Sequence, residues 1–539
     1  MRFRWFFISV FAAATLAVWI AAYRELRPRP YNVIFLTVES ARAEVLAPDV
    51  MPNVWRLAQE GVRFEDHRAV SGWTAANIVS LLTGVSPFVH GIHSRDQRVP
   101  ADWQLPLKTL SAAGWRVAGL QPFMQIEGFR DLGMIVEPGA NLLGWLAKRD
   151  QAREPFVLWY HYLDTHLPYS PPPPFRPDVD SLLPKDDLAA RSRIEKVMTL
   201  PAIPAGDLEF QPSDRAAIRA LYLADFRAFD AWFSGFWSFF ESSGLRDNTI
   251  LVFTADHGDE LLERGHVGHA STTRTGNLHE EIVHIPLVIW VPGALRKSTY
   301  PSVVTRATDH LDLMPTVFSL LGMAPTRPFS GSSVFEARVN RPWLGASSGA
   351  GFEEADPLHI SKFTFAAIDG PWKLYLIRDD GRETETALFN LDDDPGETRN
   401  IAPAEPVIVE MMRDGLMPLI ASMRLASRAT AVNAAESGSP QWIFPKRSGT
   451  YRYDDLGEQF KLQWSGDEDA VYRLQYEVGQ GALHLSGEFE VTGTLRDFGK
   501  IDRRYWEKWV VPYDPFRLRV GPASRDDRWS DWIELRAEP

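Results

Sequence analysis

The sequence predicts an α/β fold with a doubly wound, mostly parallel sheet, followed by a C-terminal all-β domain. Between residues 31 and 425, short and nearly continuous apolar runs alternate with helical patterns. Such runs are typical of strands buried on both faces of a parallel sheet, and their alternation with helices favours a doubly wound arrangement. After residue 440, apolar and polar residues alternate in short segments, which is typical of antiparallel strands with one buried face.

The N-terminal segment has the pattern of a membrane-inserting helix. Arg2 and Arg4 precede nineteen residues without charge, from Trp5 to Tyr23, and three arginines follow within residues 24–29. This length is close to the ~20 residues that a helix needs to cross a bilayer. Residues 1–30 are therefore expected to be a transmembrane anchor or a signal segment that meets the membrane through residues 5–23. Arginines flank both ends, so charge does not fix the orientation.

Five apolar runs are the expected strands of the sheet. They lie at residues 32–38, 116–121, 155–163, 248–254 and 285–292. The most regular helical patterns lie at residues 53–61 and 213–244, and the second begins at Ser213 and ends at Gly244.

The chain is long enough for several domains, because single domains rarely exceed ~250 to 300 residues. Residues 31–425 are expected to form the catalytic α/β domain and residues 426–440 a polar linker without apolar periodicity. Residues 441–539 are expected to form a β-sandwich-like accessory domain.

Composition excludes some functions. A net charge of -13 and a pI near 5.5 argue against a nucleic-acid partner, which would require a basic face. The chain has no cysteine, so disulfides, thiolate metal sites and cysteine nucleophiles are excluded. A small or lipid-borne substrate is therefore expected.

Polar side chains follow three of the expected strands. In an open α/β sheet the active site forms beyond the carboxyl ends of the strands. Glu39 follows the first run, Asp164 and His166 follow the third, and the pair Asp256 and His257 follows the fourth. A carboxylate from one strand and an Asp-His pair from another suit a divalent cation such as Mn or Zn. Taken singly, Asp256 has the alternative role of a helix cap, and Glu39 that of a partner for Arg42.

Thr74 stands in the stretch "SGWTAANIVSLLTG", residues 71–84. A threonine before an apolar run that ends in glycine is typical of a helix cap. The alternative is that Thr74 attacks a substrate, and the stretch alone does not separate these roles.

Seven segments together resemble the sulfatase branch of the alkaline phosphatase superfamily. They occur in that family's order and extend over residues 31–425: "NVIFLTVESARAE", "MPNVWRLAQEGVRFED", "SGWTAANIVSLLTGVSPFVHGI", "PFVLWYHYLDTHLPYSPPPPF", "NTILVFTADHGDELLERGH", "EEIVHIPLVIWVPG" and "ALFNLDDDPGETRNIA". The resemblance implies an alkaline phosphatase-like fold. It places metal ligands on Glu39, Asp256 and His257 and the nucleophile on Thr74, which would itself bind the metal.

The nucleophile position departs from the family pattern. Sulfatases carry a cysteine or serine there, which becomes formylglycine, with proline two residues on and arginine four residues on. This chain has Thr74, Ala76 and Ile78 instead. Threonine does not become formylglycine, whereas a metal-activated threonine alkoxide suits attack on phosphorus through a phosphothreonine intermediate. The ligand set Glu, Thr, Asp and His is similar to that of lipoteichoic acid synthases and phosphoethanolamine transferases.

Further residues are expected on the substrate side. The helix N-terminus at residues 75–77 would offer N–H groups to a developing anion, and Asn77 would add a side-chain donor unless it is a solvated helix position. The resemblance places a substrate-side histidine on His166. A second such histidine is expected at His269, with His266 and Arg274 as alternatives, and His161 is expected to be structural.

The sequence thus predicts a membrane-anchored, extracytoplasmic, metal-dependent phosphoric ester hydrolase or phosphotransferase. Its expected substrate is a phosphodiester or lipid head group, carried by a lipid or an envelope glycan. One divalent ion is expected, with Mn or Zn favoured over Mg or Ca. A sulfuric ester hydrolase and an inactive binding protein with a functional β domain are the alternatives.

Overall fold

The structure is a computed structural model, and it describes most of residues 30–538. The gaps are residues 95–96, 101–102, 121–125, 130, 138–140, 153, 201–202, 204–207, 270–275, 337–340, 349–361, 424–439, 446–447, 454–460, 467–469, 480–484, 498–502, 504–505, 507–510, 512–513 and 523–527. The predicted membrane segment, residues 5–23, and nearly all of the predicted linker lie outside the described residues. Within the described part of the chain, no helix has the length and apolar character needed to cross a membrane.

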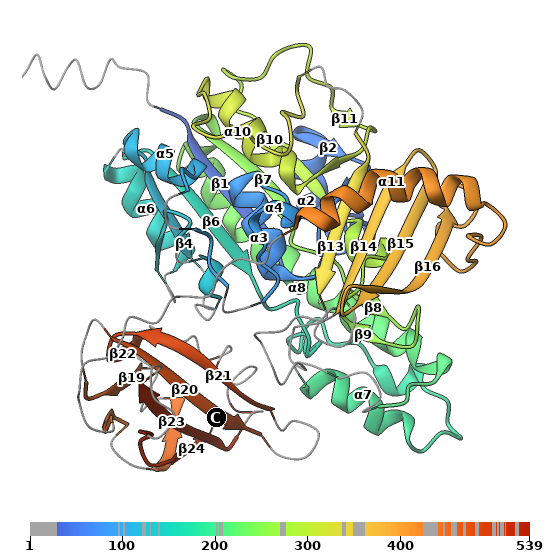
Figure 1. The fold of residues 1–539 in the computed structure, drawn as a ribbon. Helices are drawn as coiled ribbons and strands as arrows, with labels where there is room; N and C mark the ends of the chain where they lie inside the picture. The colour runs from blue at the N-terminus through green and yellow to red at the C-terminus, as the bar shows by residue number, and fades with distance from the viewer. Residues whose placement is uncertain are drawn as a thin grey trace, which may run out of the picture.

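An eight-stranded sheet forms the centre of the α/β domain, in the order β11-β2-β10-β7-β1-β6-β4-β5 (Figure 1). The five predicted strands are present as β1 (Asn32–Val38), β4 (Arg116–Leu120), β6 (Phe156–Tyr162), β7 (Thr249–Ala255) and β10 (Leu287–Trp290). The remaining strands are β2 (Val62–Phe64), β5 (Ile135–Val136) and β11 (Val303–Val304). Strand β1 pairs in parallel with both β6 and β7, so the carboxyl ends of these three strands lie at one edge.

Strand β10 departs from the expected parallel arrangement. It pairs antiparallel with both β7 and β2. The continuous apolar run at residues 285–292 predicted burial on both faces, which the structure confirms, since all of β10 is buried. Burial carries no information on strand direction. Here the chain returns from β7 to β10 through a loop and the short helix α9 (Glu280–Val283), without a crossover over the sheet.

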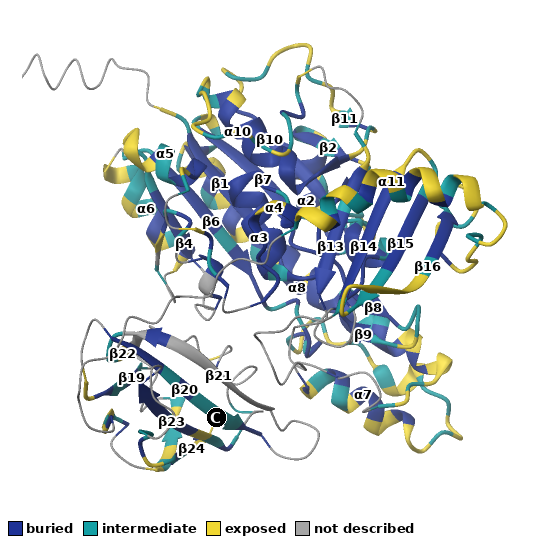
Figure 2. Ribbon diagram, in the orientation of Figure 1, coloured by how far each residue is buried: buried dark blue, intermediate teal, exposed yellow. Residues whose placement is uncertain are grey.

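Helices cover both faces of the sheet. Alternate residues of β1 face opposite ways: Ile34, Leu36 and Val38 belong to one core cluster, and Val33 and Phe35 to the other. The first cluster includes residues of α2 (Pro52–Glu60), α6 (Leu142–Ala152), α7 (Ala190–Thr199) and α8 (Arg215–Ser242). The second includes residues of α3 (Thr74–Thr83), α5 (Pro106–Ala112) and α10 (Leu313–Leu321). The doubly wound prediction is thereby confirmed, and Figure 2 shows the buried sheet between these layers.

A second sheet within the α/β domain was not anticipated. Strands β13 (Trp343–Ser348), β14 (Lys362–Asp369), β15 (Trp372–Asp379) and β16 (Arg382–Asn390) form an antiparallel sheet, and α11 (Pro406–Ser422) packs on one face. The first strand reaches back to the main domain, because Ala346 N–H donates to Val70 O at 3.1 Å and Trp343 Nε1 donates to Ala69 O at 3.0 Å. This sheet therefore holds the loop that precedes α3.

The C-terminal part consists of β strands, as predicted. One sheet has the order β18-β24-β23-β20-β21 and another β17-β19-β22. Their bounds are β17 (Trp442–Phe444), β18 (Gly449–Arg452), β19 (Lys461–Trp464), β20 (Val471–Val478), β21 (Leu485–Thr492), β22 (Leu495–Asp497), β23 (Phe516–Pro522) and β24 (Ile533–Glu538). Their shared core contains Trp464, Tyr472 and Leu474.

A buried carboxylate supports the start of α2. The residue before this helix, Met51, makes no capping hydrogen bond, and Asp230 of α8 takes that role. Its carboxylate accepts from Asn53 N and Val54 N, each at 3.0 Å, and from Asn53 Nδ2 at 2.7 Å. A carboxylate at a helix N-terminus satisfies backbone donors and interacts favourably with the helix dipole. Asp230 thus fixes α2 against α8.

We expect Asp230→Ala to lower the free energy of unfolding by about 2 to 4 kcal/mol, because it leaves buried helix donors without an acceptor. Urea unfolding followed by tryptophan fluorescence measures this loss. The exposed Asp247, which precedes β7, provides the control, and Asp247→Ala should change stability by no more than about 0.5 kcal/mol. Equal effects of the two substitutions would contradict the capping role.

Candidate active site

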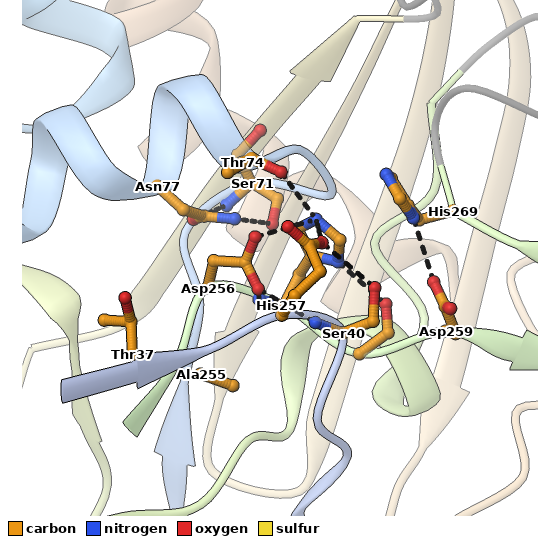
Figure 3. Close-up of polar contacts among 12 residues, drawn as sticks. Thr37, Ser40, Ser71, Thr74, Asn77, Ala255, Asp256, His257, Asp259 and His269 are labelled. Carbon is orange, nitrogen blue, oxygen red and sulfur yellow. Dashed lines mark hydrogen bonds and ion pairs between the residues drawn. The ribbon is translucent and has the colours of Figure 1, made fainter. Parts of the chain in front are cut away.

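Thr74 is the first residue of helix α3, and Trp73 occupies the N-cap position. The interpretation of Thr74 as the cap is therefore wrong by one residue, since Trp73 has the extended backbone of a cap and no side-chain oxygen to offer. The helix ends at Gly84, whose φ of 65° lies in the left-handed region, as the sequence predicts. Thr74 Oγ1 lies 3.2 Å from His257 Nε2 (Figure 3).

Glu39, Asp256 and His257 meet at the carboxyl ends of neighbouring strands. Glu39 directly follows β1, and Asp256 and His257 directly follow β7, which pairs in parallel with β1. His257 Nε2 lies 3.3 Å from Asp256 Oδ2 and 3.5 Å from Glu39 Oε1. The structure thus brings together all four residues expected to bind a metal: Glu39, Thr74, Asp256 and His257.

The two oxygens of Asp256 differ in their surroundings. Oδ1 accepts from Ser40 N at 3.0 Å and from His257 N at 2.9 Å, and Ser40 adopts a positive φ of 58° beside this contact. Oδ2 is buried and has no hydrogen-bond partner. A buried carboxylate oxygen without a donor is unfavourable unless a cation balances it. Asp256 does not have the alternative role of a helix cap. The two backbone N–H groups that donate to it, those of Ser40 and His257, lie in loops after the strands.

The donor atoms have the spacing of ligands to one ion. Two ligands of a tetrahedral ion with bonds near 2.1 Å are separated by about 3.4 Å. The three distances from His257 Nε2, to Thr74 Oγ1, Asp256 Oδ2 and Glu39 Oε1, range from 3.2 to 3.5 Å. The residues therefore fit a divalent cation with nitrogen and oxygen ligands.

The carboxylates carry opposite shifts of pKa. Burial raises the pKa of Glu39 well above its usual value, and the charge of Asp256 raises it further. Burial also acts to raise the pKa of Asp256, but the His257 and His161 charges and the backbone N–H donors outweigh burial and hold that pKa low. The pKa of His257 is raised, because the charges of Asp256 and Glu39 outweigh the effect of burial. The raised pKa values of Glu39 and His257 both reflect nearby negative charge, which favours a cation in the pocket.

His161 lies behind Glu39 in the position of a support. Its Nε2 is 2.9 Å from Glu39 Oε2, and its Nδ1 is 2.7 Å from Thr37 Oγ1. Trp159 Nε1 donates to the same threonine oxygen at 2.9 Å. These contacts agree with the structural role expected for His161, and they orient the carboxylate of Glu39.

Asn77 does not have the expected role of a substrate donor. Its Oδ1 accepts from Val70 N at 3.0 Å and from Ser71 N at 2.9 Å, and its Nδ2 donates to Ser71 O at 2.7 Å. It is fully buried, which also excludes the solvated position. The backbone N–H of Asn77 was also expected to face the anion. It instead donates to Trp73 O at 3.2 Å. Asn77 therefore fixes the loop that positions Thr74.

His166 and His269 lie beside the residues that are expected to bind the metal. The rings of His257 and His269 are 4.1 Å apart, and those of His166 and His269 are 5.0 Å apart. Of the alternatives to His269, Arg274 lies outside the described residues. His266 belongs to none of the three potential ligand sets found in the described part of the chain. Those sets are Glu39, His166 and His269; His257, Asp259 and His269; and Glu39, His161 and Asp256.

Asp259 is a site residue that the sequence interpretation missed. Its Oδ1 lies 2.9 Å from His269 Nδ1, and its Oδ2 accepts from Tyr169 OH at 2.7 Å. Burial raises the pKa of Asp259 to about 6. The segment "ADHGDE" contains this residue, but nothing in its spacing indicates that the chain turns back to place His269 beside it.

Comparison with known proteins finds two family models that each match part of the chain. The sequence model named Sulfatase matches residues 139–323, and the model named Type I phosphodiesterase / nucleotide pyrophosphatase matches residues 33–202. Arylsulfatase K of Mus musculus is 26% identical over 267 residues, which cover 48% of this chain and 44% of that protein. Arylsulfatase K of Danio rerio is 29% identical over 195 residues, covering 36% of this chain and 35% of that protein. The chain thus spans about half the length of these curated relatives, or less.

Solved structures share the fold. The phosphonate monoester hydrolase of Agrobacterium radiobacter superposes with a TM-score of 0.55 at 18% identity, covering 72% of this chain and 95% of that chain. That of Silicibacter pomeroyi superposes with a TM-score of 0.57 at 19% identity, covering 76% of this chain and 98% of that chain. The chain is thus similar in sequence to sulfatases and to type I phosphodiesterases over parts of its length, and its fold resembles that of the phosphonate monoester hydrolases.

Proposed function

We propose that this protein is a metal-dependent phosphoric ester hydrolase or phosphotransferase that uses Thr74 as its nucleophile. The observation that carries the proposal is the position of the Thr74 hydroxyl, 3.2 Å from His257 Nε2 and at the first turn of α3. A divalent ion bound by Glu39, Thr74, Asp256 and His257 would lower the pKa of that hydroxyl and polarise a phosphoryl oxygen.

The proposed reaction has two displacements. In the first, Thr74 Oγ1 loses its proton and forms a bond to phosphorus, while the bond from phosphorus to the leaving oxygen breaks and that oxygen takes up a proton. In the second, the oxygen of water or of an acceptor hydroxyl forms a bond to phosphorus and loses its proton, while the bond from phosphorus to Thr74 Oγ1 breaks and Oγ1 takes up a proton. The α3 N-terminus contributes a partial positive charge beside the attacked group. His166 and His269 are proposed to act on the substrate side.

Two observations support chemistry at phosphorus. Threonine at position 74, with Ala76 and Ile78 in place of the sulfatase proline and arginine, removes the formylglycine route. The sequence model of the phosphodiesterase family also covers Thr74, whereas the sulfatase match begins only at residue 139. Phosphonate monoester hydrolases among the structural neighbours agree with this choice.

A sulfuric ester hydrolase is the second candidate, favoured by the sulfatase match and by the arylsulfatase K relatives. The two candidates differ in the ester that is turned over. Aryl phosphodiesters, phosphomonoesters, phosphonate monoesters and sulfates should be compared at equal enzyme concentration. Preferred turnover of the aryl sulfate would overturn the proposal.

Thr74→Ala should lower kcat for the best phosphoester by at least about 10³-fold, because the variant has no oxygen to form the covalent intermediate. Mass spectrometry of the wild type, quenched during turnover, should find a phosphoryl group on Thr74. Thr74→Ser keeps the hydroxyl and should retain part of the activity. Thr83→Ala, at the other end of α3, is the matched control and should leave kcat nearly unchanged. Full activity of Thr74→Ala would exclude Thr74 as nucleophile.

Asp256→Asn should remove one bound divalent ion from each chain, because an amide cannot replace the anionic Oδ2 that faces His257. Elemental analysis after equilibration with Mn²⁺ or Zn²⁺ measures the loss. Asp214→Asn serves as control, since Asp214 is equally buried but pairs with Arg193 on α7. The proposal fails if Asp256→Asn binds as much metal as the wild type.

The proposal includes attachment to a membrane through residues 5–23, with the catalytic domain outside the cytoplasm and a lipid head group or envelope glycan as substrate. The nineteen uncharged residues between flanking arginines support this part. Removal of residues 1–30 should move the protein from the membrane pellet to the supernatant in a detergent-free extract, without loss of turnover of a soluble aryl phosphoester. Release of the full-length chain by the same extraction would contradict membrane attachment.

A further inference from the structure

We infer that Tyr222, on helix α8, is a positioning residue for the metal site. Its hydroxyl holds Ser40 in a left-handed backbone conformation, and Ser40 in turn orients the carboxylates of Glu39 and Asp256. The inference rests on the metal-binding part of the proposed function. It does not depend on which ester is turned over or on whether Thr74 is the nucleophile.

The turn after β1 has a backbone conformation that its own sequence does not favour. Ser40 has a φ of 58°, in the left-handed region, where the Cβ atom of a side chain crowds the neighbouring backbone. Glycine, asparagine and aspartate adopt this conformation more readily than serine does. Ser40 is also completely buried, so water does not stabilise the turn. Contacts from other elements must therefore hold Ser40 in this conformation.

Two side-chain hydroxyls supply these contacts. Tyr222 OH donates to Ser40 O at 2.8 Å and accepts from Arg42 N at 3.0 Å, so it bridges two peptide groups of the turn. Thr165 Oγ1 donates to the preceding carbonyl, Glu39 O, at 2.6 Å. A tyrosine hydroxyl has one hydrogen to donate, and the contact with Ser40 uses it. The position of the Tyr222 ring therefore determines the path of the chain at Ser40.

The ring of Tyr222 is fixed by the core around it. Tyr222 is completely buried, and its ring centroid lies 5.5 Å from that of Tyr169 and 4.8 Å from that of Phe226. Burial raises the pKa of Tyr222 well above its ordinary value, so the hydroxyl keeps the hydrogen that it donates. Because the ring contacts do not involve the oxygen, a phenylalanine at this position removes only the hydroxyl.

Ser40 connects this hydroxyl to both carboxylates of the site. Its backbone N–H donates to Asp256 Oδ1 at 3.0 Å (Figure 3). Its Oγ donates to Glu39 Oε1 at 3.1 Å. The angle φ sets how the N–H and the side chain of one residue lie relative to each other, so another φ at Ser40 would break at least one of these contacts. Asp256 Oδ2 is left facing His257 Nε2 at 3.3 Å, as a metal ligand requires.

The metal affinity of Tyr222→Phe tests the inference. The dissociation constant for Zn²⁺, measured by competition with a chromophoric chelator, should rise by about 10- to 100-fold, the usual effect of losing a group that orients metal ligands. The absorption spectrum of bound Co²⁺ should also change, because it reports ligand geometry. Tyr375→Phe is the matched control and should bind both ions as the wild type does. Tyr375 is also buried and hydrogen-bonded, to Thr364, but it lies on β15 of the second sheet.

Ser40→Gly separates the holding of an unfavourable backbone conformation from a general loss of packing. Glycine adopts a φ near 58° without the cost that serine incurs. In the Ser40→Gly background, Tyr222→Phe should therefore change the dissociation constant by no more than about threefold. Ser40→Gly alone measures what the serine Oγ contributes to affinity. Circular dichroism of every variant verifies that the fold is intact.

A wild-type dissociation constant for Tyr222→Phe, or an equal loss of affinity in the serine and glycine backgrounds, would overturn the inference. Metal-dependent turnover of a phosphoester would then leave the proposed function in place. A wild-type protein that binds no divalent ion would remove the proposed function and the inference together. The expected loss of affinity in a protein without phosphoester turnover would support the role of Tyr222 and remove the proposed activity.

Discussion

The central constraint on this structure is the burial of Glu39 and Asp256 at the ends of neighbouring parallel strands. Both carboxylates are almost inaccessible to solvent, and Oδ2 of Asp256 has no hydrogen-bond donor. Two such charges in one pocket repel each other and lose their hydration. The arrangement is stable only with positive charge nearby, which explains why imidazoles surround the pocket and why a divalent cation fits it. The other oxygen of Asp256, Oδ1, accepts hydrogen bonds from the backbone N–H groups of Ser40 and His257.

The second sheet holds the loop that precedes Thr74. Strand β13 holds the backbone at Ala69 and Val70, and Asn77 holds Val70 and Ser71 from the first turn of α3. Gly72 lies against Asn277 O, and a Cβ atom added there would come within 2.2 Å of that oxygen. Thr74 therefore begins its helix from a loop that is fixed on both sides. Such fixed positioning is what the nucleophilic role proposed for Thr74 requires, since small displacements reduce reactivity strongly.

The family relationship and the proposed chemistry are separate matters. The fold and the positions expected to bind the metal resemble those of sulfatases, whereas the residue at the expected nucleophile position differs. A fold supports different reactions when a few side chains in its site change. In this chain the change is concentrated at Thr74 and Ile78, where a hydroxyl and an apolar side chain replace a modified residue and a cation.

The sequence by itself determined the main strands, the two-layer helix arrangement, the C-terminal β strands and the meeting of Glu39, Thr74, Asp256 and His257. Most of these features depend on local patterns, because burial on both faces is visible in a run such as residues 32–38 and parallel strands bring their carboxyl ends to one edge. The place of Thr74 in the site is instead what the family resemblance implies. Only the tertiary structure decided the direction of β10, the sheet β13–β16, the engagement of Asn77 and the pairing of Asp259 with His269. Each of these depends on contacts between residues from separate elements, or on the return path of a loop. Apolar periodicity reports which side chains are buried, but it does not report which polar atoms they will meet.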